Sequence, residues 1–194
     1  MDIYYDPIYT NGIDDKSRFP KERYQLIYKE IINSNYKKYI DFIKPKKANI
    51  NDILLAHDSI YVKKFFDNKL DMKEKRKIGL LPWNNSIFER TLKIMGGSIG
   101  ALKSSINSSI SANMAGGTHH AFFNHGAGYC IFNDIAVCTQ IAIRDFNLKN
   151  IIIIDLDVHQ GDGTASILKN NDNLFTFSMH CEKNFPLKKE KSNL

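Results

Sequence analysis

The chain has 194 residues, of which 43% are hydrophobic, and a net charge of +6 from 27 Lys+Arg against 21 Asp+Glu. This composition excludes a disordered or fibrous protein and allows a single domain over residues 1–194. No stretch approaches the roughly 20 uninterrupted apolar residues that a membrane helix needs, and the N-terminus is not ordered like a signal peptide. We therefore expect a soluble, cytoplasmic protein with no membrane partner.

The surplus positive charge is concentrated in lysine runs such as KEKRK and LKKEKSNL. These runs belong to no recognised nucleic-acid module, so they favour a solvated surface, and nucleic acid is not an expected partner. Cys130, Cys138 and Cys181 form no CxxC pair. Their odd number indicates a reducing compartment and structural thiols rather than a disulfide framework.

Helices are predicted first along the chain. In residues 18–43, beginning near Pro20, the helical spacing of apolar side chains predicts an amphipathic helix that faces the core. The side chains on this stripe are Tyr24, Ile27, Tyr28, Ile31 and Ile32. Residues 49–68 predict a loop followed by a short helix, with His57 as a surface or packing residue rather than a ligand.

A longer helix is predicted over residues 86–106, where Ser86 and Glu89 stand in capping-box relation. Within it, Gly96 and Gly97 allow another segment to pack closely. The following stretch, from Ser111 onward, is rich in glycine and histidine and poor in charge. This composition is typical of a loop that leads into a pocket.

Two further helices are predicted beyond this loop. One covers residues 133–148 and is capped by Asn133 or Asp134. The other covers residues 163–171. Each lies next to an apolar stretch that favours a strand.

Strands are predicted over residues 150–159 and 173–180. The first begins with the run NIIII, which is typical of a strand buried on both faces. Strand, helix and strand in this order imply a right-handed crossover in a parallel α/β sheet, whose functional residues lie at the carboxyl ends of the strands. His159 and His180 fall at such ends.

The segment DLDVHQGDG at the end of the first strand carries the strongest chemical signal. Asp155, Asp157 and His159 follow one another at every second residue, so an extended chain places them on one side. Two carboxylates and an imidazole can then face one cation, and Zn²⁺, Fe²⁺, Co²⁺ or Mn²⁺ would each accept these donors.

The tandem histidines His119 and His120 provide acid–base chemistry near neutral pH. Two adjacent imidazoles can hold a water molecule and pass its proton on, provided that acceptors orient the rings. The segment from residue 155 to residue 163 contains more carboxylates than one metal ion requires. Asp155 and Asp162 are therefore the candidate orienting partners.

Consecutive blocks of the chain resemble the histone deacetylase family, in its class IV-like branch with many bacterial members. The blocks are AGGTHHAF, GAGYCIFNDIAV, IIIIDLDVHQGDGTA and TFSMHCEKNFP, and RFPKERY, AHDSIYVKKF and IGLLPW are similar to earlier ones. The resemblance spans nearly the whole chain and is most specific from Gly116 to Pro186. It implies a three-layer α/β fold with a central parallel sheet, of the arginase–deacetylase type, truncated at its C-terminus.

The resemblance implies roles for the metal ligands and the bases. Asp157 and His159 match the first two zinc ligands of the family. His119 and His120 match its tandem histidines, of which the second is the usual general base and acid. The implied activity is the removal of acetyl or other acyl groups from lysine side chains or from small acetylated amines.

The resemblance also implies roles for residues around the metal ligands and the histidines. Asp155 and Asp162 match the carboxylates that orient the histidines. Gly128 and Tyr129 match one wall of a narrow acyl-lysine tunnel, where the family more often has Phe than Tyr, and Phe185 is a candidate for the opposite wall.

A monovalent-cation site is implied as well. Backbone carbonyls around Asp155, Asp157 and His159, together with Ser178, resemble that site, and K⁺ is the expected occupant. This second cation would account for part of the crowding of carboxylates.

Two parts of the family pattern have no match in this sequence. All nine tyrosines occur at or before Tyr129, so none stands where the family has its oxyanion-stabilising tyrosine. After Asp162 the only aspartate is Asp172, which does not have the glycine-rich context of the third ligand. We therefore expect the N-terminal part of a deacetylase domain that is inactive or nearly so alone and that associates with a complementary C-terminal fragment.

Three other functions fit some of these features. An inactive remnant or acetyl-lysine binder fits the two unmatched parts, and a binuclear-manganese ureohydrolase fits the clustered Asp and His. A basic nucleic-acid binder ranks last.

Overall fold

The computed structural model describes residues 1–191, so the last three residues of the predicted 1–194 domain lie outside it. The chain divides into two compact units, each built from two stretches of sequence. Unit 1 comprises Met1–Ile50 and Leu80–Gly116, and unit 2 comprises Asn51–Gly79 and Gly117–Leu194.

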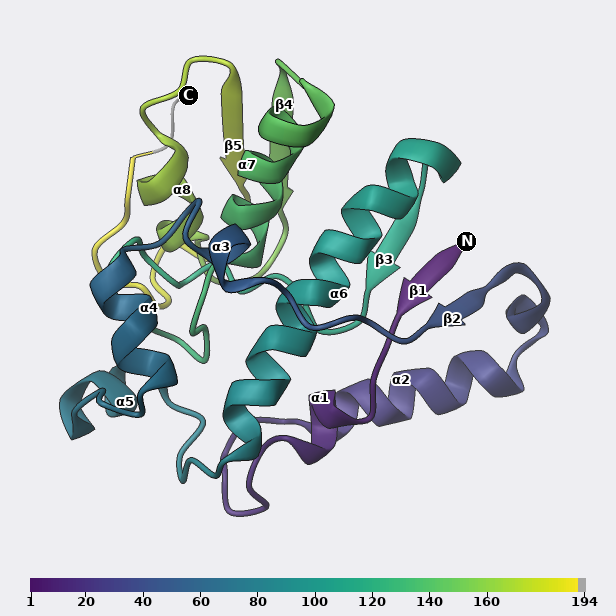
Figure 1. Cartoon of the computed structure of the whole chain (residues 1–194), viewed down its shortest axis with the longest axis horizontal. Helices are drawn as coiled ribbons and strands as arrows, with labels where there is room; N and C mark the ends of the chain where they lie inside the picture. The colour runs from purple at the N-terminus through teal and green to yellow at the C-terminus, as the bar shows by residue number, and fades with distance from the viewer. Residues whose placement is uncertain (192–194) are drawn as a thin grey trace. The chain divides into compact units, whose positions relative to one another are not determined.

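Unit 1 contains a parallel sheet of three short strands in the order β2-β1-β3 (Figure 1). Its strands are β1 (Asp2–Tyr4), β2 (Asp41–Ile43) and β3 (Ser111–Asn113). Its helices are α1 (Ile8–Asn11), α2 (Glu22–Asn33), the 3₁₀ helix η1 (Asn35–Tyr39) and α6 (Ser86–Ser108). The sequence did not predict these strands, because each is too short to show an apolar alternation.

The long helix α6 confirms the prediction for residues 86–106, with one correction at its start. A side chain at Gly96 would collide with the backbone at Lys46, and one at Gly97 would meet Tyr9 and Asn113, so both glycines permit close packing as predicted. The predicted capping box is wrong, because Asn85 is the N-cap and forms no side-chain cap. Ser86 already lies inside the helix.

Helix α2 is less buried than its pattern predicts. Tyr24 is its only buried residue among those described, while Ile27 and Ile32 are exposed by 49% and 38%. Tyr28 does pack inward, with its ring stacked on Tyr5 at 4.3 Å. The spacing of apolar residues predicted the helix correctly. Only some of these apolar residues are buried, however.

Unit 2 contains the strand–helix–strand arrangement expected from the sequence. Its two strands, β4 (Ile151–Asp155) and β5 (Leu174–Ser178), pair in parallel, and α8 (Asp162–Leu168) connects them (Figure 1). Helix α7 (Asp134–Phe146) precedes β4 and contacts α8. The remaining helices are α4 (Ser59–Phe66) and α5 (Met72–Ile78). The short helix α3 (Ile50–Ile53) begins at the last residue of the first stretch of unit 1 and continues into unit 2.

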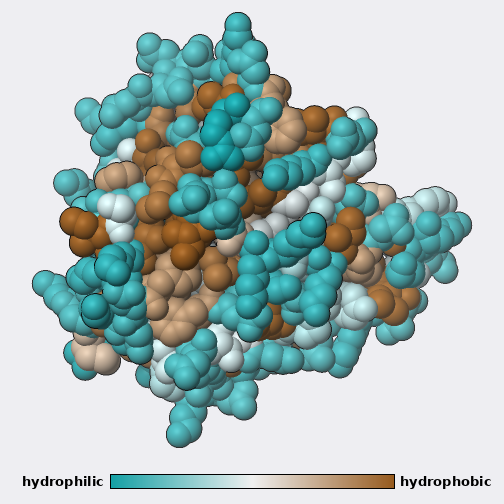
Figure 2. Space-filling view, in the orientation of Figure 1, coloured by the Kyte–Doolittle hydropathy of each residue, from teal (hydrophilic) through white to brown (hydrophobic). Residues whose placement is uncertain are grey.

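The burial of β4 corrects the expectation of a strand covered on both faces. Ile153 is 8% exposed, but its neighbours Ile152 and Ile154 are each 59% exposed. One face of the two-stranded sheet therefore packs inside the unit, where α8 contacts β5, and the other face is open within the unit. Figure 2 shows apolar side chains at the surface among hydrophilic ones.

Both sheets are parallel and helices accompany them, which confirms the α/β fold class and is consistent with the arginase–deacetylase type. Strand β4 is shorter than predicted, because the chain leaves the extended conformation after Asp155. Within residues 1–191, no helix combines the length and the apolar character needed to cross a membrane.

Candidate active site

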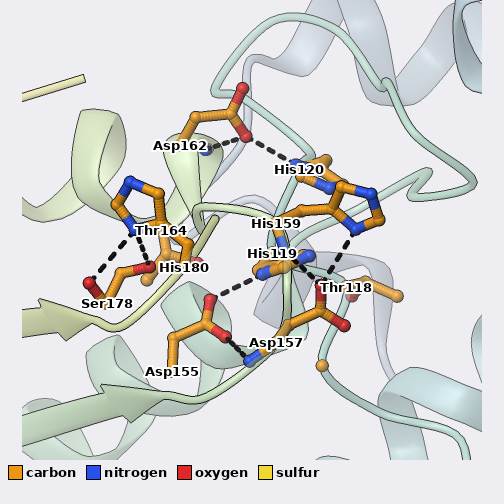
Figure 3. A network of polar contacts seen from close by, with 12 residues as sticks. Thr118, His119, His120, Asp155, Asp157, His159, Asp162, Thr164, Ser178 and His180 are labelled. Atoms are coloured by element: carbon orange, nitrogen blue, oxygen red, sulfur yellow. Dashed lines mark hydrogen bonds and ion pairs between the residues drawn. The ribbon is translucent and has the colours of Figure 1, made fainter. Parts of the chain in front are cut away.

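The site is built in unit 2, where the loop that carries the tandem histidines meets the end of β4 and the start of α8 (Figure 3). His119 Nδ1 lies 2.5 Å from Asp155 Oδ2, at the last residue of β4. Because a carboxylate can only accept, Nδ1 carries the hydrogen and Nε2 faces away from the aspartate. Burial opposes protonation of His119, but the hydrogen bond to Asp155 and the charges of Asp155, Asp157 and Asp162 outweigh it and raise its pKa.

His120 is paired in the same way with a different carboxylate. Its Nδ1 lies 2.7 Å from Asp162 Oδ1, and the side chains of both residues are almost fully buried. Asp162 begins α8, where the helix dipole favours negative charge, and its Oδ1 also accepts from the Gly163 amide at 3.0 Å. The His119 and His120 rings lie 4.0 Å apart, so two oriented imidazoles stand side by side.

A buried carboxylate holds the start of the histidine loop. Asp134, in the first turn of α7, accepts hydrogen bonds from the amides of Gly117 at 3.1 Å and Thr118 at 2.7 Å. The Thr118 hydroxyl also lies 2.6 Å from Asp134 Oδ1. The sequence identified Asp134 only as a possible helix cap, so its connection to the loop was missed.

Asn133 holds the other end of the loop. It caps α7 through the Ala136 amide at 2.9 Å, as predicted, and its side-chain amide donates to the Ala121 carbonyl at 3.1 Å and to the Thr164 hydroxyl at 3.0 Å. The backbone amide of Thr164 in turn donates to the His119 carbonyl at 3.1 Å. Helices α7 and α8 are thereby tied to the histidine segment.

His57 is a packing residue, as the sequence suggested, but it is buried rather than at the surface, with 2% exposure. Nδ1 donates to the Phe122 carbonyl at 3.0 Å, and Nε2 accepts from the Asn133 amide at 2.8 Å. Because Nε2 can accept only when it carries no hydrogen, the ring is neutral. Burial outweighs the hydrogen bonds to Phe123 and Phe122 and lowers its pKa to about 4.

Asp157 and His159 lie on the turn that follows β4. Asp155 Oδ1 accepts from the Asp157 amide at 3.0 Å, and Asp157 Oδ1 accepts from the His159 amide at 2.8 Å, so successive carboxylates bend the chain. The bend brings His159 Nδ1 to 3.0 Å from Asp157 Oδ1. Asp157 and His159 therefore converge, although Asp155 turns instead toward His119.

The Asp157–His159 pair fits part of a metal site. Two donors that bind one tetrahedral Zn²⁺ at about 2.1 Å stand roughly 3.4 Å apart, so the 3.0 Å between these two atoms would have to open by a few tenths of an ångström. Burial would raise the pKa of Asp157, but hydrogen bonds from His159 and the nearby charges of His119 and His159 lower it, which favours the ionised form that a metal needs. Among the described residues, no group of three or more His, Cys, Asp or Glu side chains could hold a metal ion.

The candidate tunnel residues border the same rings. The Phe185 ring lies 4.9 Å from the His120 ring and 6.1 Å from the His159 ring, edge to face with both. A side chain at Gly128 would collide with the His120 ring, so this position requires glycine. Tyr129, 45% exposed, has φ 68°, a left-handed conformation that tyrosine rarely adopts.

The candidate monovalent-cation residues are only partly brought together. Asp155 and Ser178 are register partners in the sheet, and both line a small cavity of about 20 Å³ with Gln160 and Thr176. That volume has room for about one water-sized sphere. Asp157 and His159 do not line it, and the assignment stays a prediction.

His180 lies apart from the other histidines. Its Nδ1 is 3.0 Å from the Ser178 hydroxyl and 3.1 Å from the Ser178 carbonyl. Of the cysteines, Cys130 is buried, and this burial raises its thiol pKa to about 12. Cys181 is exposed, so the prediction of a structural thiol does not fit that position.

Comparisons with known proteins found similarity to a family model and to individual proteins. A family model described as the histone deacetylase domain matches residues 17–194. An uncharacterised protein of Picosynechococcus sp. is 38% identical over 192 residues, which are 99% of this chain and 64% of that protein.

Two relatives with names are more distant. The acetoin utilization protein AcuC of Staphylococcus aureus is 27% identical over 187 residues, covering 92% of this chain and 48% of its own length. The histone deacetylase clr6 of Schizosaccharomyces pombe is 30% identical over 168 residues, covering 81% and 41%. The chain thus spans between 41% and 64% of the length of these relatives.

Proposed function

Because the chain belongs to the histone deacetylase family, we propose that it forms part of a metal-dependent amidohydrolase that removes acetyl or other acyl groups from lysine side chains or related small amines. The observation that carries the proposal is the pair of adjacent imidazoles, each bonded through Nδ1 to its own carboxylate. Asp157 and His159, which converge beside them, would supply two of the metal ligands.

His120 acts as the general base and acid. Its Nδ1–H donates to Asp162, so the lone pair of Nε2 can accept a proton from the attacking water. Water oxygen bonds to the acyl carbon, the carbon–nitrogen bond breaks, and the proton passes from Nε2 to the leaving amine. The direct products are a carboxylic acid, such as acetic acid, and the free amine, and the acid then loses its remaining proton to the amine, which leaves a carboxylate and an ammonium group.

His119 has a different role, because its ring is bonded to Asp155 and lies among the charges of Asp155, Asp157 and Asp162, which raise its pKa. A larger fraction of its rings carries the second proton near neutral pH than for an ordinary histidine. Held by Asp155 and adjacent to His120, it stabilises the negative charge that builds on the reacting oxygen atoms.

Asp157 and His159 would hold the divalent cation, with Zn²⁺ first and Fe²⁺, Co²⁺ or Mn²⁺ as alternatives. When bound, such an ion polarises the acyl carbonyl and lowers the pKa of a coordinated water. The third ligand and the tyrosine hydroxyl of the family pattern are proposed to come from a complementary part of the domain. The protein is further proposed to work in the cytoplasm and to take up K⁺ beside Asp155 and Ser178.

Gly128, Tyr129 and Phe185 would guide the substrate. The Phe185 ring packs against the rings of both His120 and His159, so an alkyl chain lying on it would end at the reacting groups. The exposed Tyr129 would form the opposite wall.

A fusion protein tests the function directly. This chain is joined in one polypeptide to the part of the Picosynechococcus relative that it does not match, and release of acetate from an acetyl-lysine peptide and from an acetylated polyamine is followed with added zinc. We expect turnover by the fusion and almost none by the 194-residue chain. An inactive fusion that binds one zinc ion and still binds acetyl-lysine peptide would favour the non-catalytic binder, and two manganese ions per site would favour a ureohydrolase.

A further inference from the structure

Positive charge is concentrated in the hairpin of α4 and α5, two helices that lie next to each other in unit 2 (Figure 1). Residues 59–79 contain seven Lys and Arg against three Asp and Glu, a surplus of four, whereas the whole chain has a net charge of +6. The sequence predicted a solvated surface for the run KEKRK in this segment. Most of the excess charge of the chain therefore belongs to one hairpin.

The acidic side chains of the hairpin already have partners. Asp67 forms ion pairs with Lys63 at 3.1 Å and with Lys69 at 3.3 Å. Lys64 pairs with Glu74 at 2.6 Å and so joins α4 to α5. The third acidic residue caps the start of α5. These contacts neutralise the lysines of α4 and of the turn that follows it.

Three exposed cations of α5, which we name the basic face, are not neutralised in this way: Lys73, Arg76 and Lys77. They stand at i, i+3 and i+4, so they share one side of the helix. None of the ion pairs within residues 1–191 includes any of them. Lys75, between them in sequence, instead donates to the Asn68 side chain at 2.9 Å.

Helix stability does not account for the basic face. Arg76 and Lys77 lie in the last turn of α5, where the helix dipole favours cations, but Lys73 lies in the first turn, where it favours anions. Lys73 and Lys77 also stand at i and i+4, a spacing at which like charges repel and destabilise a helix. A negatively charged partner would offset this repulsion.

The basic face ends at the candidate wall of the acyl-lysine tunnel. The Gly128 amide donates to the Lys77 carbonyl at 3.2 Å, and the Tyr129 amide donates to the Ile78 carbonyl at 2.6 Å. A side chain at Gly79 would collide with the Tyr129 ring, so this ring packs directly on the residue that follows α5. The last turn of α5 is thus bound to the segment that is proposed to guide the substrate.

Lys77 also lies near the proposed base. Burial lowers the pKa of Lys77, and the charge of Asp162, the partner of His120, opposes this effect. Such an influence requires proximity, because the interaction between two charges weakens with distance and is screened by water. The cation closest to the wall is therefore also close to the His120–Asp162 pair.

We propose that the basic face selects acyl-lysine within an acidic peptide, with aspartate or glutamate close to the acyl-lysine in sequence. The inference rests on the proposed function, because it chooses between the two substrate classes that this function leaves open. An extended peptide advances about 3.3 Å per residue, so carboxylates within about three residues of the acyl-lysine would come within reach of Lys77. An acetylated polyamine is a cation near neutral pH, and the basic face repels it.

A nucleic acid fits the basic face less well. The seven residues of α5 form a helix about 10 Å long, which spans only about three nucleotides of a strand. Proteins that bind single strands also stack bases on aromatic side chains, and the sequence MKEKRKI of α5 contains none. An acyl-lysine peptide, in contrast, would enter the site at the wall where the face ends.

The test uses the fusion protein and three acetyl-lysine peptides, which carry two glutamates, two serines or two lysines on each side of the acetyl-lysine. Values of kcat/KM are measured at low and at high salt. The test variant is Lys73→Gln with Lys77→Gln. The matched control is Lys63→Gln with Lys69→Gln, which removes the same charge from the same hairpin, but at lysines paired with Asp67. Circular dichroism compares the folding of the variants.

We expect the acidic peptide to exceed the lysine-flanked peptide in kcat/KM by about tenfold at low salt, and this preference should shrink at high salt because exposed charges are screened. The test variant should lower kcat/KM for the acidic peptide by about fivefold, mainly through KM, whereas the control should stay within about twofold of the parent. The acetylated polyamine should be the poorest substrate.

A binding measurement needs no turnover. Fluorescence anisotropy follows the three labelled peptides, and a single-stranded DNA oligonucleotide with the charge of the acidic peptide, on the full 194-residue chain with added zinc. The acidic peptide should bind most tightly, and the test variant should bind it about fivefold more weakly than the control does.

Three results would overturn the inference: equal kcat/KM for the acidic and the serine-flanked peptide, equal losses in the two double variants, or tighter binding of the oligonucleotide than of the acidic peptide. The two proposals can fail separately. A fusion that hydrolyses none of the peptides, while the chain still binds the acidic one through the basic face, contradicts the proposed function alone. Turnover without any preference for acidic peptides contradicts the role of the basic face alone.

Discussion

The tandem histidines and the Asp157–His159 pair differ in how far the protein itself fixes their geometry. The side chains of His119 and His120 are 7% and 5% exposed, and each ring is hydrogen-bonded to a carboxylate from another segment. The side chains of Asp157 and His159 are 50% and 36% exposed and are neighbours on one turn. The proposed acid–base half of the site is therefore preorganised by the protein, whereas the proposed metal half has only local hydrogen bonds to fix its geometry.

The difference has a structural origin. The histidine loop is anchored by buried side chains at several points, including Asp134, Asn133 and His57. Each of these makes hydrogen bonds to backbone groups, which fixes the path of the chain and not only one side chain. The turn after β4 has instead a series of local bonds from carboxylates to the next amides.

The largest effect should follow from removing the base. In the active fusion, His120→Ala should lower kcat by about a thousandfold, within the range for a lost general base, and change KM little. His125→Ala, in the same loop but stacked on Phe122, is the control and should retain most of the activity. Steady-state kinetics on an acetyl-lysine peptide decides this, and full activity of His120→Ala would remove His120 from the mechanism.

The anchoring of the loop predicts a large effect on stability. Asn133→Ala removes the cap of α7 and leaves the Ala121 carbonyl and the Thr164 hydroxyl without this donor, so the free energy of unfolding should fall by about 3 kcal/mol. Asn85→Ala is matched, because Asn85 is the N-cap of α6 but forms no side-chain cap, and should change stability by less than about 0.5 kcal/mol. Urea unfolding followed by circular dichroism compares the two. Equal effects would show that the network does not anchor the loop.

Because Asp157 and His159 are exposed, we expect the loss of one of them to lower the affinity for metal while changing the free energy of unfolding little. Asp157→Ala should weaken zinc binding by about a hundredfold, because it removes a charged ligand, whereas Asp172→Ala in the exposed turn before β5 should not. Competition with a chromophoric chelator at constant pH measures both. Unchanged zinc affinity in Asp157→Ala would place the ion elsewhere.

A smaller effect is expected from pH. His57 has a folded pKa of about 4 and an ordinary value near 6.5, so the folded state binds fewer protons than the unfolded state between these values. His57 therefore contributes to the free energy of unfolding above pH 6.5, and this contribution is lost as the pH falls toward 4. Between pH 7.5 and pH 5 the loss should be about 2 kcal/mol.

The variant His57→Gln isolates this contribution. Glutamine can also donate and accept, but it does not titrate, so the difference in unfolding free energy between parent and variant should shrink as the pH falls. His119 works in the opposite sense, because its raised pKa gives stability that is lost as the pH rises. A parent–variant difference that is independent of pH would exclude His57 as the titrating group.

Local signals in the sequence were sufficient for some elements and not for others. The four isoleucines before Asp155 predicted β4, and the Asn133 cap predicted the start of α7. Strands β1, β2 and β3 have three residues each and form through partners distant in sequence, so they leave no local pattern. The exposure of Ile152 was missed for a related reason, because composition indicates that a strand face is to be covered but not by which segment.

The site shows the same limit. Residue types and spacing selected Asp155, Asp157, His159 and Asp162 as a group, but not which carboxylate turns to which ring. The bond between His57 and the Asn133 amide joins positions 76 residues apart and has no signal in a single sequence. The left-handed conformation of Tyr129 was likewise invisible, since tyrosine does not favour it. The catalytic roles themselves stay predictions.

Zinc K-edge X-ray absorption of the zinc-loaded fusion protein is the most direct test of the division between a metal half and an acid–base half. We predict one imidazole in the coordination shell, which disappears in His159→Ala and persists in His119→Ala and His120→Ala. Two imidazoles in the shell would contradict this division. So would a shell that changes when His119 or His120 is substituted and not when His159 is.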